Sequence, residues 1–172
     1  GATNELLIQE QGKPEPIHAN PSFTKIQTHE LSASPEAVLA EHKKAAQEQC
    51  NEKRDQCIDE GFMFEGVHYQ TRPTDRENIS GAALLATQVK MAGGGADGDY
   101  RWQDADSDFE WIATDNSIVK MDASKAMRFG QQAAAYKQAL IMFSRGVKNQ
   151  IAAAQTLEEI QQILEGATWP VV

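Results

Sequence analysis

The sequence has little cysteine, no long apolar run and fewer basic than acidic residues. Two cysteines, Cys50 and Cys57, are too few for the disulfide framework of a small secreted domain. No stretch reaches the roughly 20 apolar residues of a membrane-spanning helix, and the N-terminus has neither the basic region nor the apolar core of a signal peptide. With 16 Lys and Arg against 25 Asp and Glu, the formal net charge is -9. Because like charges repel, neither nucleic acid nor membrane insertion is expected.

Length and composition are typical of one globular domain with room for an additional arm. The 172 residues are 41% hydrophobic, which is enough to bury a core. Gly1 stands where a Met would begin a natural chain, so we expect the natural start to lie upstream.

The clearest pattern is that of a long helix from Asp122 to Ala154. The Asp122 carboxylate can cap its first turn by accepting hydrogen bonds from free backbone amides at the positive end of the helix dipole. Gly130 and Gly146 each cost about 1 kcal/mol relative to Ala, so each either bends the helix or marks a close contact with another one. Its apolar residues are spaced three and four apart and so share one face: Phe129, Ala133, Tyr136, Leu140, Phe143, Val147, Ile151 and Ala154.

A second long helix is predicted over residues 34–61. Ser34-Pro35-Glu36 combines a capping hydroxyl with a proline at the first helical position, and Gly61 ends the pattern. The helix is highly charged and its apolar stripe is thin, so two interpretations stay open. It either projects as a stalk that binds a partner or a second copy, or lies on its own domain. The predicted partner-binding residues are Val38, Ala46, Cys50 and Cys57.

The two cysteines lie seven residues apart on this helix. At 1.5 Å per residue they are about 10 Å apart along the axis, too far to bridge each other. Two interpretations remain: reduced thiols in a cytosolic protein, or a bridge between chains at a helix pair.

Short strands and further helices fill the rest of the sequence. Residues 62–71 predict a β-hairpin that turns at Glu65-Gly66. Capping boxes at Thr74–Glu77 and Thr156–Glu159 each begin a helix, and residues 100–121 predict three aromatic-rich strands joined by acidic turns. Several residues are assigned inward positions or close packing: Ile79, Gly81, Ala82, Ala83, Ala86, Val89, Leu157, Ile160, Ile163, Leu164 and Trp169.

The fold class predicted from these elements is α+β. A small antiparallel β-sheet, made of the hairpin and the aromatic strands, packs on the long C-terminal helix, and the N-terminal helix projects from it. The predicted organisation is an extended arm over residues 1–33, the long polar helix over 34–61 and a compact domain over 62–172.

One acidic cluster partly matches the ligand spacing of a calcium loop. Asp104, Asp106, Asp108 and Asp115 could act as metal ligands, but Phe109 stands where such a loop needs glycine and the flanks predict strands instead of helices. We therefore interpret the cluster as an acidic hairpin turn and predict no metal and no cofactor.

The sequence predicts no catalytic residues. The histidines are in four separate contexts without zinc spacing, no serine is in a nucleophile elbow, and the Gly93-Gly94-Gly95 run lacks the Lys-Ser or Lys-Thr of a phosphate loop. Tyr100, Trp102 and Trp111 could stack on a sugar or a base, but their alternation beside a long apolar helix favours the core.

From about Glu52 onward the order of short motifs resembles a family known as domain of unknown function 4376. The resemblance covers about two thirds of the chain. Such domains are common in phages and prophages, often at the C-terminal end of tail or tail-fibre proteins, and the family brings no catalytic residues. The matching motifs are Lys53-Arg54-Asp55, Gly61-Phe62, Phe64 to Thr71, Arg76 to Ala82, Tyr100-Arg101-Trp102, Phe109 to Asn116, Ile151 to Ala154 and Trp169-Pro170.

The resemblance implies a non-enzymatic structural or assembly module of a phage or prophage tail. Its partners would be tail or tail-fibre proteins, with a homo-oligomer through the helices as a further option, and its location the virion tail or the host cytoplasm. Two alternatives stay open. One is an intracellular chaperone for tail-fibre assembly that is absent from the virion, and the other is a small-ligand or calcium-binding module.

Overall fold

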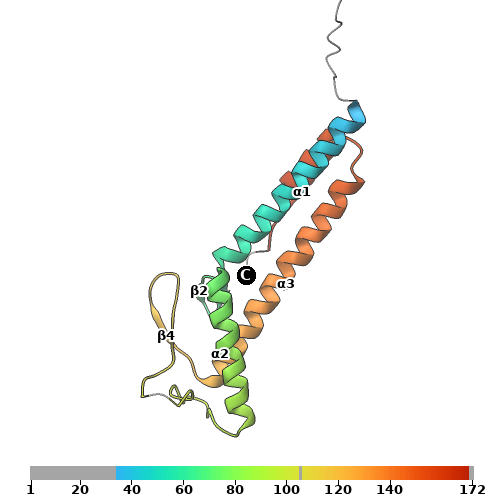
Figure 1. Ribbon diagram of the computed structural model, residues 1–172. Helices are drawn as coiled ribbons and strands as arrows, with labels where there is room; N and C mark the ends of the chain where they lie inside the picture. The colour runs from blue at the N-terminus through green and yellow to red at the C-terminus, as the bar shows by residue number, and fades with distance from the viewer. Residues whose placement is uncertain (1–33, 105, 171–172) are drawn as a thin grey trace, which may run out of the picture. The chain divides into compact units, whose positions relative to one another are not determined.

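The computed structural model describes residues 34–104 and 106–170, and the arm predicted over residues 1–33 lies outside them (Figure 1). The described part contains four helices and two β-hairpins in the order α1, β1, β2, α2, β3, β4, α3, α4. This confirms the predicted α+β class and the long C-terminal helix. Among the described helices, none is long and apolar enough to cross a membrane.

Helix α1 (Pro35–Glu60) begins and ends where its sequence predicts. The Ala37 N–H donates to Ser34 Oγ at 3.2 Å, which satisfies one of the free amides of the first turn. Gly61 follows with a φ of 99°, and a Cβ there would collide with the carbonyl oxygen of Tyr69. Only glycine therefore allows the chain to turn from α1 directly into the first hairpin.

The strands form two separate two-stranded sheets instead of the single small sheet expected from the sequence. Strands β1 (Phe62–Phe64) and β2 (Val67–Tyr69) pair around Glu65 and Gly66, whose φ angles of 50° and 79° suit a tight hairpin turn. Strands β3 (Glu110–Ile112) and β4 (Ile118–Lys120) form the second hairpin.

The first of the three predicted aromatic strands is absent, because residues 100–104 form turns. Trp102 is buried all the same. Its indole N–H donates to the Met121 carbonyl at 2.9 Å. This side-chain hydrogen bond fixes the position of Trp102, which the sequence had assigned to a paired strand.

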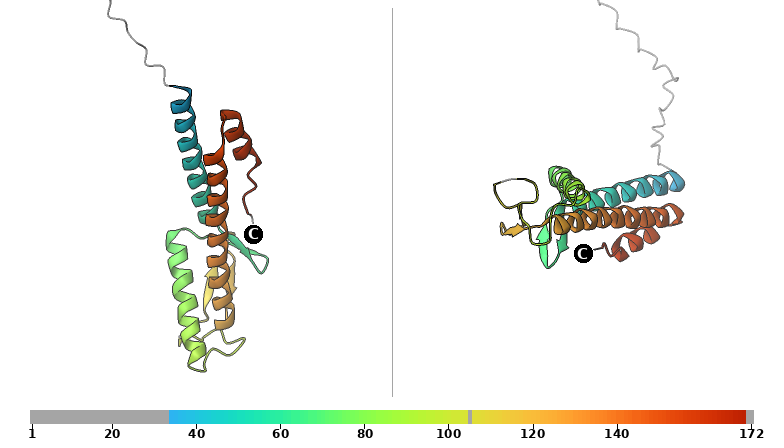
Figure 2. Two further views of the ribbon diagram at one scale, coloured as in Figure 1. Left: turned by 90° about the vertical axis from the view of Figure 1, so that its right-hand side faces the viewer. Right: turned by 90° about the horizontal axis from the view of Figure 1, so that it is seen from below.

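Helix α2 (Pro73–Met91) begins two residues earlier than its predicted capping box implies, with Arg72 in place of Thr74 at the capping position. The Arg72 N–H donates to the Asp75 carboxylate at 3.1 Å, so Asp75 makes the bond that the sequence assigned to Glu77. The N-terminal part of helix α3 (Ala123–Ala153) runs beside α2 (Figures 1 and 2). The two helices approach closely at Gly130, where an added Cβ would collide with Ala83, whereas Gly81 faces open space.

Both ends of α3 match the sequence. The Lys125 N–H donates to Asp122 Oδ1 at 2.8 Å, and the helix ends at Ala153. Helix α4 (Leu157–Gly166) is capped by Thr156, whose hydroxyl accepts from the Glu159 N–H at 3.1 Å. Ile160 points inward as predicted, but Leu157 is 45% exposed.

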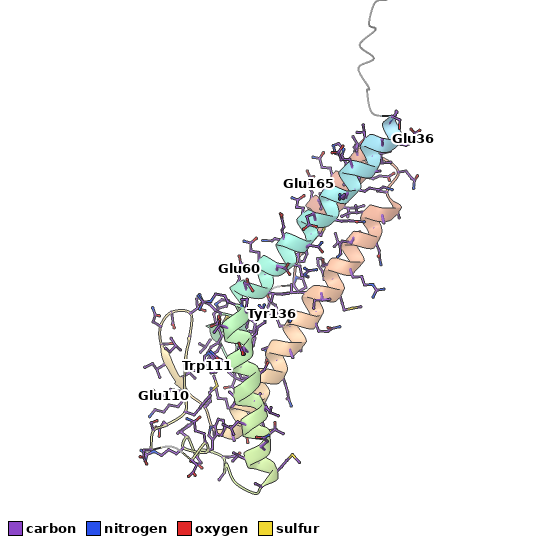
Figure 3. The ribbon with its side chains drawn as sticks, in the orientation of Figure 1. Glu36, Glu60, Glu110, Trp111, Tyr136 and Glu165 are labelled. Atoms are coloured by element: carbon purple, nitrogen blue, oxygen red, sulfur yellow. The ribbon has the colours of Figure 1, made fainter. Side chains whose placement is uncertain are left out.

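Three buried clusters connect these elements. The largest joins the end of α1, both hairpins, Ile79 of α2 and α3 as far as Leu140. Tyr136, labelled in Figure 3, belongs to it and donates its hydroxyl to the Cys57 carbonyl at 3.2 Å. A second cluster joins α1, α3 and α4, and a third joins Trp102 to α2 and α3. The Trp169 ring packs on Phe143 with centroids 5.0 Å apart, so the C-terminal segment folds back as expected.

Candidate functional site

The predicted partner-binding stripe on α1 is covered by the domain itself. Ala46 and Cys50 are 4% and 2% exposed and pack in the cluster that α3 and α4 complete. Cys57 is 7% exposed and belongs to the largest cluster, and Val38 is half-buried. Helix α1 therefore lies on its own domain, as the second of the two interpretations predicts. An interface at the three buried positions would require α1 to separate from α3 and α4.

Both cysteines are free thiols. Burial raises the pKa of the Cys50 thiol and that of the Cys57 thiol, which keeps them in the unreactive protonated form. While α1 stays packed, neither sulfur is accessible for a bridge between chains.

The four candidate calcium ligands do not come together in one site. The Asp108 carboxylate pairs with Lys120 Nζ at 2.8 Å and Arg101 Nε at 3.2 Å, which lowers its pKa. Asp115 accepts from the Ser117 hydroxyl at 2.6 Å and from the Ser117 N–H at 2.9 Å, within its turn. Asp104 and Asp106 are exposed. Within residues 34–104 and 106–170, no group of three or more His, Cys, Asp or Glu side chains could hold a metal ion.

His68 makes a contact that links the two hairpins. Its Nδ1 lies 2.9 Å from the Thr114 hydroxyl, and the Thr114 N–H donates to the His68 carbonyl, also at 2.9 Å. A histidine beside a hydroxyl resembles a base beside a nucleophile, but no carboxylate among the described residues accepts a hydrogen bond from its ring to orient it. The contact is better explained as a structural link that holds the two hairpins together.

One surface hollow is an open groove of about 810 Å³ between α3, α4 and the residues directly after α4. It is lined mainly by apolar and amide side chains, including Phe143, Val147 and Gln150. Glu159, the one ionisable residue in its lining, already accepts a hydrogen bond from the Gln155 N–H at 2.6 Å. Catalysis by converging acids and bases needs more than one such group.

Two exposed apolar patches were missed by the sequence reasoning. On α2, Leu84 is 61% and Met91 84% exposed, with Leu85 beside them at 40%. On the second hairpin, Ile112 and Ile118 are direct cross-strand partners and are 66% and 62% exposed.

The signal for both patches is present in the sequence. Helix α2 has more apolar residues than can fit on the face that packs against the domain. Leu84, Leu85 and Met91 lie outside that face. In the hairpin, Trp111 packs its ring on Phe129 with centroids 5.3 Å apart. The alternation of strands therefore turns Ile112 outward together with Glu110, which is labelled in Figure 3.

These features define an α+β domain of packed helices that presents apolar patches on its surface. The chain belongs to the family described as Domain of unknown function (DUF4376), which matches residues 41–164. The shared region therefore starts within α1, earlier than the Glu52 boundary expected from the motifs. No curated protein and no solved structure matches the chain in these comparisons.

Proposed function

We propose that this domain is a non-enzymatic structural or assembly module of a phage or prophage tail, which acts through contacts with tail or tail-fibre proteins. The observation that carries the proposal is the pair of exposed apolar patches, on α2 and on the second hairpin. Exposed groups of large apolar side chains are typical of surfaces that another protein covers. The tail context is supported by the resemblance of the motifs to domains found in tail proteins.

The proposal is tested by mass spectrometry of purified particles and by a pull-down with the products of neighbouring tail genes. A structural module is expected in the finished particle. If the domain captures a fibre protein but is missing from the particle, it acts as an assembly chaperone instead. No capture and no presence in particles would contradict both roles.

The contacts themselves can be tested with variants of the α2 patch. Leu84→Ser with Met91→Ser should reduce capture at least tenfold, since central apolar residues dominate most interfaces. The melting temperature should fall only slightly, because both side chains are exposed and the main loss is the weaker helix propensity of Ser. Asn78→Ser changes an exposed residue near the start of the same helix, six residues before the patch; it is the matched control and should capture normally.

A further inference from the structure

Helix α3 is basic in an acidic chain. Over its 31 residues it contains no Asp or Glu, although the chain has a formal net charge of -9. Three of its five basic residues are satisfied within the domain. Lys125 and Arg128 pair with Glu65 at 2.8 and 2.9 Å, and Lys148 donates to Asn51 at 2.8 Å. Lys137 and Arg145 are exposed, and neither forms an ion pair with another described residue.

The two free cations flank apolar residues on the outer side of α3. Ile141 and Met142 are 37% and 52% exposed, and Lys137 and Arg145 lie four residues before and four after Ile141. Tyr136, Leu140 and Val147 point to the opposite side, into the buried clusters. At 3.6 residues per turn, this spacing puts the cations on the same outer half of the helix as Ile141.

The same face of a second α3 helix does not suit this surface. If two α3 helices met antiparallel with Ile141 of one copy on Ile141 of the other, Lys137 of each would lie opposite Arg145 of its partner. Like charges placed across an interface oppose association. The surface instead favours an occupant of opposite charge.

We propose that the outer face of α3, defined by Lys137, Ile141, Met142 and Arg145, binds an acidic amphipathic helix of a partner protein. Eight residues of helix span about 12 Å, so carboxylates seven or eight residues apart on the partner would meet both cations. Apolar residues between those carboxylates would cover Ile141 and Met142, in the way that helices commonly dock on apolar surfaces. This inference rests on the contact-making role proposed above and adds the surface and the chemistry of one partner.

The test measures fluorescence anisotropy with a designed helical peptide that has two Glu residues eight apart and Leu between them. Two matched peptides replace both Glu residues by Gln or by Lys. The natural sequence should bind the Glu peptide at least tenfold more tightly than the Gln peptide. Lys137→Glu with Arg145→Glu should weaken Glu-peptide binding at least tenfold and create binding to the Lys peptide. Met142→Ser should weaken binding to both the Glu and the Gln peptide.

The control makes the same change of charge elsewhere. Lys44→Glu with Lys53→Glu changes two exposed residues of α1 and should leave binding within twofold of the natural sequence. Equal binding of the Glu and Gln peptides would overturn the proposal, and so would a control that loses as much affinity as the α3 variant. If sedimentation shows a dimer that Met142→Ser dissociates, a second copy occupies the face and the proposal is wrong. None of these outcomes affects the tail role, which is tested on particles.

Discussion

Two buried hydroxyl groups differ in whether they form a hydrogen bond, and this difference determines their effect on stability. Ser144 is fully buried on α3, and its Oγ has no hydrogen-bond partner among the described residues. Thr71 is buried as well, but its hydroxyl donates to the Ile58 carbonyl near the end of α1. A buried polar group without a partner costs free energy, whereas a paired one stabilises the fold.

We therefore expect opposite effects from removing the two hydroxyls. Ser144→Ala should raise the free energy of unfolding by about 1 kcal/mol, and Thr71→Val should lower it by about 1–2 kcal/mol because the Ile58 carbonyl loses its donor. Urea denaturation monitored by circular dichroism measures both. A loss of stability in Ser144→Ala would mean that its hydroxyl does have a partner.

Two glycines of α3 form a second matched pair. Gly130→Ala forces a methyl group against Ala83, so overpacking should lower the free energy of unfolding by about 1–3 kcal/mol, partly offset by better helix propensity. A Cβ at Gly146 has nothing within 4 Å, so Gly146→Ala should raise that free energy by up to about 1 kcal/mol. Equal effects of the two substitutions in thermal melts would contradict the close contact between α2 and α3.

At the scale of elements, the first hairpin is tied to α3 through Glu65. Hydrogen bonds from Lys125 and Arg128 lower the pKa of its carboxyl below the ordinary 4.5. Because the folded-state pKa is lowered, the stabilisation is present above that ordinary value and is lost as the pH falls through the folded-state value.

Glu65→Gln should reproduce that loss at neutral pH. The side chain is 43% exposed, so the decrease in the free energy of unfolding should stay below about 1 kcal/mol. In denaturation curves at successively lower pH, the difference between the two proteins should shrink below pH 4.5 and then vanish. A difference that stays constant in acid would exclude the ion pairs as its cause.

Local chemistry predicts most of the element boundaries from the sequence. The caps at Ser34, Asp122 and Thr156 each satisfy a free amide within three residues, so neighbouring residues alone determine where these helices begin. The first hairpin is similarly local, since its Glu65-Gly66 turn fixes the pairing of Phe64 with Val67.

Long-range packing accounts for what the sequence did not predict. From the sequence, Cys50 could face either a partner or its own domain. It is buried because α4, about a hundred residues later in the chain, packs in the same cluster. Trp102 fits a strand by its alternation, but its bond to the Met121 carbonyl places it in a turn. The charge asymmetry of α3 is visible in the sequence, but only the burial pattern shows which of its cations remain free.

At the scale of the whole molecule, α1 is part of the packed domain. The described residues, 34–104 and 106–170, belong to one compact unit. Helix α1 contributes Cys57 and Ile58 to the largest buried cluster and Ala46 and Cys50 to the second. The boundary predicted at residue 61 therefore separates two elements that share a core.

A fragment that begins at Gly61 should consequently fail to fold. Loss of four buried side chains from two clusters removes more stability than a small domain has in reserve. Its thermal unfolding should show no cooperative transition, whereas the fragment that begins at Ala33 should melt cooperatively. A sharp melt of the shorter fragment would mean that residues 62–172 are an autonomous domain.

The thiols of Cys50 and Cys57, buried on the inner face of α1, can report how often this helix separates from the rest of the domain. An alkylating reagent can attack them only during such openings, so the labelling rate of the native protein measures the frequency of the motion without any added probe. A partner that clamps α1 onto its neighbours would slow the labelling, and one that inserts beneath it would accelerate it.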